Sequence, residues 1–469
     1  MKKYMDNKFL LTNRKAEQLY NEFARDIPIF DYHSHLPVEE IASNRCFSTI
    51  TELWLEHDHY KWRAMRWCGI EERFITGYAP DFEKFKAWAE CMPFLLRNPL
   101  YHWCHMELRE FFGIDDVILG PETAKDVYDR CNSVLQKGDL DVRTILKIMK
   151  VDTLYTTNDP VEELSYHKML RNENSLNINI FPALRPDNAL CIEDPELFNG
   201  WIRELGRTTD MDIDTFDDLI EGIEKSYENF HKAGCRASDH GIEVTYAQVP
   251  TLQKVRKLFS AARKGVKLKG KEIVQYKAFL MKIFAELNTR KGWVMQLHLG
   301  AKRNNNSLYF SKLGADSGFD SIGENHTGDQ LVAYLDQLSI ERQVPKMVIF
   351  NSNPRDNELL VSIIGSFQAG EKPGRIQFGP AWWFNDTEEG IIKQLEALSG
   401  LGVLGKFIGM VTDSRSFLSF VRHDYFRRIL CNLLGREMEK GMIPDDIELV
   451  GKTVQNICYN NAKKFFTEE

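Results

Sequence analysis

Eight short apolar runs, each ending in polar residues, constrain the fold of this chain more than any other feature of the sequence. The runs span residues 27–33, 151–156, 178–184, 235–239, 293–298, 347–351, 376–378 and 407–412. Amphipathic stretches with helical periodicity lie between most of them, such as residues 330–338, 357–367 and 389–398. A strand followed by a helix, repeated eight times, predicts an α/β fold of the (β/α)8 TIM-barrel type. A doubly wound open sheet is the structural alternative.

Two long insertions interrupt this repeat. The larger one, residues 36–149, follows the first strand, holds five of the nine tryptophans and predicts helices such as one over residues 82–96. We expect it to fold as a helical subdomain over the barrel mouth, with the barrel formed by residues 1–35 and 150–469. The second insertion, roughly residues 188–232, predicts additional helices.

The composition is that of a globular protein, with 43% hydrophobic and 27% charged residues. A formal net charge of −8 argues against a nucleic-acid partner, because phosphate binding requires a basic face. The first ten residues are too polar for a signal peptide, and no apolar run is long enough to span a bilayer. Nine cysteines without a CxxC pair favour reduced, mostly buried thiols. We therefore expect a cytoplasmic protein without a membrane partner; a homo-oligomer is an expectation from other barrels, not from any residue.

Histidines and an aspartate stand at the carboxyl ends of the runs, where the active sites of barrels lie. His33 and His35 end the first run two residues apart, which on a strand places both imidazoles on one face. His298 ends the fifth run, and Asp413 follows the eighth. We predict a metal site of His33, His35 and Asp413, with His298 as a further candidate ligand. Such a set suits Zn²⁺, which we favour, or Mn²⁺ or Fe²⁺; for Asp413 a helix N-cap and a proton carrier beside the metal are alternatives.

These strand-end residues resemble the metal-binding pattern of the amidohydrolase superfamily. Longer stretches are similar to one branch of it, the uronate (glucuronate) isomerases: residues 57–66 (HDHYKWRAMR), 296–301 (QLHLGA), 303–306 (RNNN), 381–386 (AWWFND) and 411–419 (VTDSRSFLS). The resemblance covers essentially the whole chain. Two-metal hydrolases of the superfamily need a lysine or glutamate at the end of strand four, where this chain has Ser238, Asp239 and His240. A single-metal site is therefore favoured, and a bridging role for Asp239 stays open.

The resemblance implies an aldose–ketose isomerase that interconverts D-glucuronate and D-fructuronate, and D-galacturonate and D-tagaturonate. A proton moves from C2 to C1 through an enediolate, and a divalent cation stabilises the developing charge. The candidate bases are Asp413 and Tyr60, whose phenol a guanidinium such as Arg415 could drive toward phenolate. A metal-dependent hydrolase or decarboxylase on the same barrel is the alternative function. A non-catalytic sugar-acid binding protein is less favoured, because binding alone would not require these candidate bases.

The carboxylate of a hexuronate requires a fixed cation, and the planar fork of arginine suits it. Arg185 follows the third run and is the expected partner, with a salt bridge to Asp187 as its alternative role; Arg303 and Arg415 are reserve candidates. Further expected substrate contacts are His59, His298, Trp382 and Trp383. Because Tyr60 and His59 belong to the larger insertion, that insertion must fold over the barrel mouth for them to act. Structural roles are expected for His102, His105, His167, His231, His326 and His423.

Overall fold

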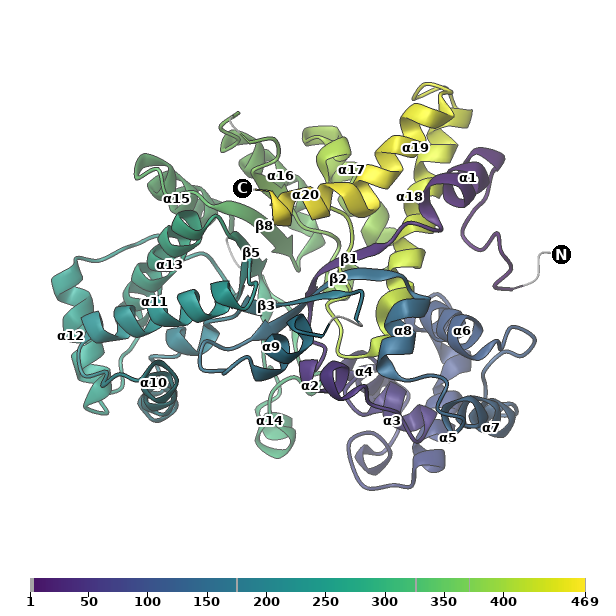
Figure 1. Ribbon diagram of the computed structural model, residues 1–469, viewed down its shortest axis with the longest axis horizontal. Coiled ribbons are helices and arrows are strands. Elements are labelled where there is room, and N and C mark those ends of the chain that lie inside the picture. Colours follow the sequence, from purple (N-terminus) through teal and green to yellow (C-terminus); the bar gives the residue numbers. More distant parts are fainter. Residues whose placement is uncertain (1–3, 174–175, 325–326, 371, 469) are drawn as a thin grey trace.

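A curled sheet of seven parallel strands forms the centre of the computed structural model, which describes residues 4–173, 176–324, 327–370 and 372–468 (Figure 1). The strand order is β1-β2-β3-β4-β5-β8-β9, and every neighbouring pair is parallel. The strands are β1 (Ile29–Ser34), β2 (Val151–Asn158), β3 (Asn179–Leu184), β4 (Ala237–Ile242), β5 (Val294–Leu299), β8 (Lys346–Asn351) and β9 (Ile376–Phe378). Each corresponds to one of the first seven apolar runs.

Helices connect the successive strands and cover the outside of the sheet. They are α9 (Ser165–Arg171), α10 (Pro195–Thr209), α11 (Phe216–Lys232), α12 (Leu252–Arg263), α13 (Lys271–Lys291), α15 (Thr327–Ile340), α16 (Asn357–Ser366) and α17 (Glu388–Leu401). Three of them, α15, α16 and α17, confirm the helices predicted from amphipathic periodicity. The helices α10 and α11 occupy the second predicted insertion, preceded by the short turn η4 (Asp187–Leu190).

The two ends of the chain pack against each other. Their elements are α1 (Arg14–Leu19), η1 (Tyr20–Ala24), α18 (Val421–Glu439), α19 (Ile447–Gln455), η9 (Asn456–Asn460) and α20 (Asn461–Thr467). Phe466 of α20 stacks on the inward-facing Tyr32 of β1, with ring centroids 5.0 Å apart. Lys346, the first residue of β8, donates to the carbonyl of Phe465 at 2.8 Å. The terminal helix therefore closes the barrel at the end opposite to the predicted active site.

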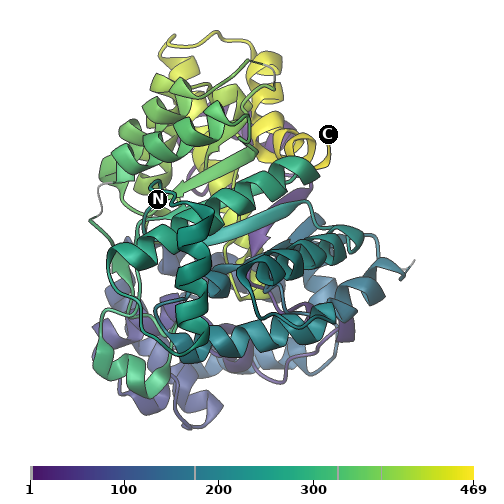
Figure 2. The same ribbon diagram turned by 90° about the vertical axis from the view of Figure 1, so that its left-hand side faces the viewer.

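Seven helices lie between β1 and β2, as expected for the larger insertion. They are α2 (Val38–Ser43), α3 (Ile50–Leu55), α4 (His59–Trp67), α5 (Asp81–Cys91), α6 (Pro99–Phe112), α7 (Ala124–Leu135) and α8 (Val142–Ile148), with the turns η2 (Glu72–Phe74) and η3 (Met92–Leu95). They gather at one end of the molecule, the lower end in Figures 1 and 2. Trp54, Trp88 and Trp103 are buried among them. The boundaries of a separate subdomain at residues 36 and 149 stay a prediction.

The eighth apolar run does not form the predicted strand. Residues 407–412 have no ladder partner, although most of their side chains are buried. Side chains bind the carbonyls that a neighbouring strand would use: the Tyr32 hydroxyl donates to the Gly409 oxygen at 3.1 Å, and the Asn461 amide donates to the Phe407 oxygen at 2.8 Å. The prediction of eight strands is therefore wrong at this position, because side chains of β1 and α20 bind these carbonyls in place of a neighbouring strand.

Gly409 is the residue that fixes this irregular path. Its φ is 74°, and a Cβ atom at this position would lie 2.3 Å from the Ile457 carbonyl oxygen. We expect Gly409→Ala to lower the free energy of unfolding by about 3 kcal/mol, from left-handed strain and the forced shift of the neighbouring backbone. Urea denaturation measures this change. Gly405→Ala, which has open space around it, is the control, and equal stability of the two variants would contradict this account.

A small hairpin excursion between β5 and β8 was not anticipated. It consists of β6 (Ala301–Lys302), α14 (Ser307–Leu313) and β7 (Ser321–Ile322), with β6 and β7 antiparallel. Two arginines of α4 bind its backbone: Arg63 donates to the Asp320 oxygen at 2.7 Å, and Arg66 donates to the Ser317 oxygen at 2.5 Å. The excursion, marked by α14 in Figure 1, is thereby held against the insertion.

Two further expectations concern the burial of the cysteines and the possibility of a membrane-spanning helix. All nine cysteines are free, and six are buried, which confirms that most of the thiols lie in the interior. Within the described ranges of the chain, no helix combines the length and the apolar character needed to cross a membrane.

Candidate active site

A bulge in β1 turns His33 into the barrel mouth. Asp31 and Ser34 pair with residues of β2 that are only two positions apart, so β1 holds one extra residue between them. Tyr32 faces the barrel interior, and strict alternation would direct the next side chain outward. The extra residue removes this constraint, and the His33 ring lies 4.4 Å, centroid to centroid, from that of His298 on β5.

His33, His35 and Asp413 converge as the sequence predicts. Oδ1 of Asp413 lies 3.0 Å from Nε2 of His33 and 3.2 Å from Nε2 of His35. Ligand atoms around a tetrahedral zinc ion lie about 3.4 Å apart. These two distances are close to that spacing, and the ligand atoms of all three residues lie within 4.8 Å of one another, so one ion could be shared among them. Asp413 adopts a left-handed φ of 44°, and such strained residues concentrate at functional sites.

Charges in this cluster suit a cation. Burial alone would raise the pKa of Asp413, but hydrogen bonds from His33 and His35 lower it well below its usual range. Burial lowers the pKa of His35 to about 4, which keeps its imidazole neutral and able to bind a metal. For His33, the carboxylates of Asp239 and Asp413 outweigh burial and raise the pKa. The position between the two carboxylates therefore favours positive charge.

Asp239 organises a second cluster beside the first. Its carboxylate lies 2.7 Å from Nδ1 of His298 and 3.9 Å from Nδ1 of His33. Arg185 donates to the same carboxylate at 3.0 Å and supplies the positive charge that an ion would bring. Burial raises the pKa of Asp239, yet Arg185 and the two histidines lower it well below its usual range. Nε2 of His298 is buried without a hydrogen-bond partner, as expected of an atom that meets a ligand.

One cavity brings together all eleven predicted site residues. Its lining comprises His33, His35, His59, Tyr60, Arg185, His298, Arg303, Trp382, Trp383, Asp413 and Arg415, together with His57, Asp58, Asp316 and Ser414. The residues come from the carboxyl ends of the strands, from α4 of the insertion and from the hairpin excursion. The insertion therefore reaches the barrel mouth, as the positions of His59 and Tyr60 require.

Tyr60 lies in the cavity wall, but not in the environment that was predicted. Its hydroxyl donates to Oδ2 of Asp386 at 3.1 Å, and the guanidinium of Arg422 lies 5.0 Å from its ring centroid. Arg415 binds Asp316 instead, at 2.8 Å. Burial, together with Asp386, raises the pKa of Tyr60 well above its usual value. This contradicts the prediction that Arg415 drives the phenol toward phenolate.

The three candidate arginines all form ion pairs, and two of them share one carboxylate, that of Asp316. Arg185 binds two carboxylates, Asp187 at 2.8 Å and Asp239 at 3.0 Å, so the alternative salt bridge with Asp187 is present. Arg303 lies 3.4 Å from Asp316 and 3.8 Å from Asp320. In the described part of the chain, Arg415 forms an ion pair with Asp316 alone. Arg303 and Arg415 each engage a single guanidinium nitrogen in these contacts, whereas Arg185 engages two, so Arg303 and Arg415 keep more donors for a bound anion.

Trp382 and Trp383 shape the cavity from the loop after β9. The Trp382 indole donates to Oδ2 of Asp413 at 2.5 Å, which fixes the carboxylate that faces the two histidines. Trp383 adopts a left-handed φ of 54°, a genuine strain for a bulky residue. The Arg303 guanidinium lies 4.7 Å from its ring centroid, and the His59 ring meets it edge to face at 5.7 Å.

Besides His57, Asp58 and Ser414, three charged residues near the site escaped prediction as site residues: Asp316, Asp386 and Arg422. Asp316 belongs to the unforeseen hairpin excursion, and no strand end signals it. Asp386 ends the quoted stretch 381–386, and Arg422 follows the stretch 411–419 by three residues. For Asp386 and Arg422, this position in or near a quoted stretch was the only signal in the sequence. Their contacts with Tyr60 depend on how the insertion packs against the barrel.

Most of the histidines assigned structural roles have partners away from the cavity. The contacts are His102 with Tyr425 (3.2 Å), His105 with Tyr101 (2.7 Å), His167 with Thr156 (2.7 Å), His231 with Trp293 (3.0 Å) and His423 with Asp31 (3.9 Å). His326 lies outside the described residues.

This chain is similar in sequence and fold to known proteins over its full length. The glucuronate isomerase family model matches residues 1–466. The uronate isomerase of Cellvibrio japonicus is 46% identical over 463 residues, which cover 99% of this chain and 98% of that protein. The one of Caldanaerobacter subterraneus is 47% identical over 469 residues, 99% of each. The crystal structure of the uronate isomerase from Thermotoga maritima superposes with a TM-score of 0.92 at 34% identity, covering 99% of each chain.

This likeness confirms the predicted fold class, an α/β barrel of the TIM type. It also confirms the predicted reaction class over the hydrolase and decarboxylase alternative. The protein is an aldose–ketose isomerase that acts on a small uronate, and the buried histidine and aspartate cluster could hold a metal ion. On its full-length match to the family model, the chain belongs to the glucuronate (uronate) isomerase family.

Proposed function

We propose that this isomerase converts D-glucuronate to D-fructuronate, and D-galacturonate to D-tagaturonate, with one divalent cation held by His33, His35 and Asp413. The observation that carries the proposal is the convergence of two imidazole nitrogens on one carboxylate oxygen, at 3.0 and 3.2 Å, inside a cavity that arginines also line. The donor set favours Zn²⁺, with Mn²⁺ or Fe²⁺ as alternatives. When bound, the cation would act as a Lewis acid toward the sugar oxygens on which negative charge develops.

The substrate carboxylate is assigned to Arg415, with Arg303 beside it. Both arginines share Asp316, whereas Arg185 is held by two carboxylates of its own. A guanidinium with free donors can meet a carboxylate through two parallel hydrogen bonds. The role of Arg185 becomes structural, since it keeps Asp239 ionised next to the two histidines.

Proton transfer between C2 and C1 is assigned to Tyr60. Both oxygens of Asp413 are engaged, one by His33 and His35 and the other by the Trp382 indole. Tyr60 lines the same cavity, and its hydroxyl donates to Asp386, which is not among the lining residues. Asp413 therefore serves as ligand and anchor, and Tyr60 is the group free to exchange a proton with the substrate.

The remaining predicted contacts orient the sugar. His298 offers its buried, unpaired Nε2 to a hydroxyl group, because Asp239 already binds its Nδ1. His59 stands beside Tyr60 with its ring stacked at 5.1 Å. Trp382 and Trp383 give apolar walls against which the C–H face of a sugar packs. We also keep the expectation of a cytoplasmic, self-associating enzyme that binds neither nucleic acid nor membrane.

Turnover of D-glucuronate, followed by NMR in D₂O, tests this function. We expect the ketose to appear with the metal-loaded protein, to stop after chelation and to return when Zn²⁺ is added back. Isomerisation conserves mass, whereas a decarboxylase would release carbon dioxide. The absence of ketose with metal present, or carbon dioxide as product, would overturn the proposal.

A further inference from the structure

We propose that Asp386 is a positioning residue that exchanges a proton with Tyr60 during each turnover. In this arrangement Tyr60 carries the proton of the substrate, while Asp386 takes and later returns the phenolic proton. The inference rests on the proposed role of Tyr60 and extends it to a residue that does not line the cavity.

The contact between the two residues is direct and buried. The Tyr60 hydroxyl donates to Oδ2 of Asp386 at 3.1 Å, and Asp386 is only 4% exposed. Tyr60 is fixed from behind by its place in the first turn of α4, where its backbone N–H donates to the N-cap residue Asp58 at 2.9 Å. Asp386 follows the turn η6 (Trp383–Asn385) after β9. The phenol therefore belongs to a residue of the cavity wall and is bound by a buried carboxylate that is not part of that wall.

Arg422 of α18 supplies the positive charge for this pair. Its Nη1 lies 3.7 Å from Oδ2 of Asp386, and its guanidinium carbon lies 5.0 Å from the Tyr60 ring centroid. The same nitrogen donates to the Thr412 carbonyl at 3.2 Å, and the side chain is 2% exposed. Because Arg422 is close to both partners, it stabilises a negative charge on the carboxylate or on the phenolic oxygen.

Acid–base properties support a proton acceptor at this position. Burial raises the pKa of Asp386 to about 7, against the lowering effect of Arg422 and of the Tyr60 hydrogen bond. The negative charge of Asp413 also raises the pKa of Asp386. The charge of Asp386 in turn raises the pKa of Tyr425, a further titratable group on α18. A carboxyl group that titrates near neutral pH can take and release a proton with little cost at the working pH.

The exchange balances in protons and electrons. Asp386 begins ionised and Tyr60 begins protonated. As the C2–H bond breaks, its electron pair enters the enediolate, its proton joins the Tyr60 oxygen, and the original phenolic proton moves to Oδ2 of Asp386. The proton of the C2 hydroxyl passes to the neighbouring C1 oxygen of the enediolate, so that C2 becomes the ketone and C1 the alcohol. Delivery of the proton from Tyr60 to C1 then draws the stored proton back from Asp386. No oxidant, reductant or further reactant is needed.

Asp386→Asn is the decisive variant, because the amide can still accept the Tyr60 hydrogen bond but cannot take its proton. We expect kcat for D-glucuronate to fall about 10² to 10³-fold, with KM within about twofold of wild type. Wild-type kcat is expected to fall as the pH drops below about 7, as Asp386 becomes protonated. In Asp386→Asn we expect kcat to be independent of pH between 8 and 6.

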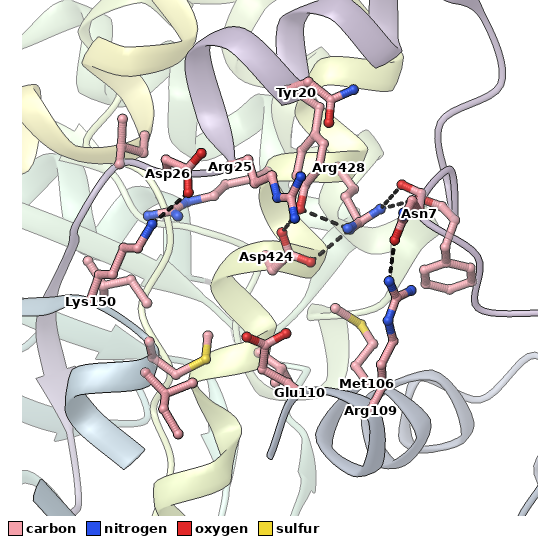
Figure 3. A pocket seen from close by; sticks show the side chains of 18 of the residues that line it. Asn7, Tyr20, Arg25, Asp26, Met106, Arg109, Glu110, Lys150, Asp424 and Arg428 are labelled. Atoms are coloured by element: carbon pink, nitrogen blue, oxygen red, sulfur yellow. Dashed lines mark hydrogen bonds and ion pairs between the residues drawn. The ribbon is translucent and has the colours of Figure 1, made fainter. Parts of the chain in front are cut away.

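Glu110→Gln is the matched control. Glu110 belongs to α6 and is exposed, but partial desolvation raises its pKa too. It lines a separate cavity near the amino end of β1, beside Arg109 and Asp424 (Figure 3). We expect this variant to keep the kcat and the pH profile of wild type.

The outcomes separate the inference from the function on which it rests. A folded Asp386→Asn variant with wild-type kcat and the wild-type pH profile overturns the inference, whereas an inactive wild-type enzyme overturns the proposed function. Thermal melting shows whether the variant folds. If it does not, Tyr60→Phe serves instead: its residual kcat should be independent of pH between 6 and 8, and retention of the acidic loss would overturn the role of Asp386.

Discussion

Replacing His35 with alanine is expected to reduce kcat/KM by at least about 10³-fold, equivalent to about 4 kcal/mol of transition-state stabilisation. The substitution removes one of the two imidazoles that face Asp413, at 3.2 Å, and leaves too few ligands to retain an ion. His35 is preferred over His33 for this test because its side chain is 24% exposed, whereas that of His33 is 1% exposed. Loss of His35 should therefore spare the fold. Elemental analysis of the dialysed protein, together with the rate of D-glucuronate turnover, measures both effects.

A second histidine variant controls for the loss of an imidazole as such. His102 lies on α6 and binds the Tyr425 hydroxyl at 3.2 Å, away from the cavity. His102→Gln should keep the metal content and the turnover of wild type. If His35→Ala also kept both, the assignment of the metal to His33, His35 and Asp413 would be wrong.

Much of the site could be predicted from the sequence, because the active sites of barrels lie at the carboxyl ends of the strands. In a barrel the carboxyl ends of all strands meet at one mouth, so residues as distant in sequence as His33 and Asp413 can be assigned to one site without any contact information. The same rule placed Arg185 and His298 correctly in the cavity. This assignment of residues to one site requires only the order of strands and helices, which can be predicted from apolar periodicity.

Three features of the site could not be predicted from the sequence, because they depend on tertiary packing. The bulge that directs His33 inward is a change in pairing register, and no residue type announces it. The partner of the Tyr60 hydroxyl is Asp386 rather than the predicted Arg415, because the insertion packs against the loop after β9. Asp316 reaches the site through a hairpin that α4 holds by its arginines. Each of these features depends on how elements pack, and not on the local pattern of apolar residues.

Arg415→Met is the second variant with a large expected effect, and Arg185→Met is its counterpart. If Arg415 binds the substrate carboxylate, its loss should raise KM for D-glucuronate about 100-fold, equivalent to about 2.7 kcal/mol, with little change in melting temperature. Arg185→Met should instead lower the free energy of unfolding by about 3 to 5 kcal/mol, because it leaves the buried Asp239 without its guanidinium.

Measuring KM and the free energy of unfolding for both variants distinguishes an arginine that binds the substrate carboxylate from one that stabilises the fold. Arg415 is 30% exposed in its side chain and pairs with Asp316, whereas Arg185 contacts the fully buried carboxylate of Asp239. The two effects should therefore separate, with KM changing in the first variant and stability in the second. The reverse result, a stable Arg185→Met enzyme with a greatly raised KM and an Arg415→Met enzyme with normal KM, would return the substrate carboxylate to Arg185. The anionic end of the sugar would then lie beside Asp239, on the strand-four side of the mouth.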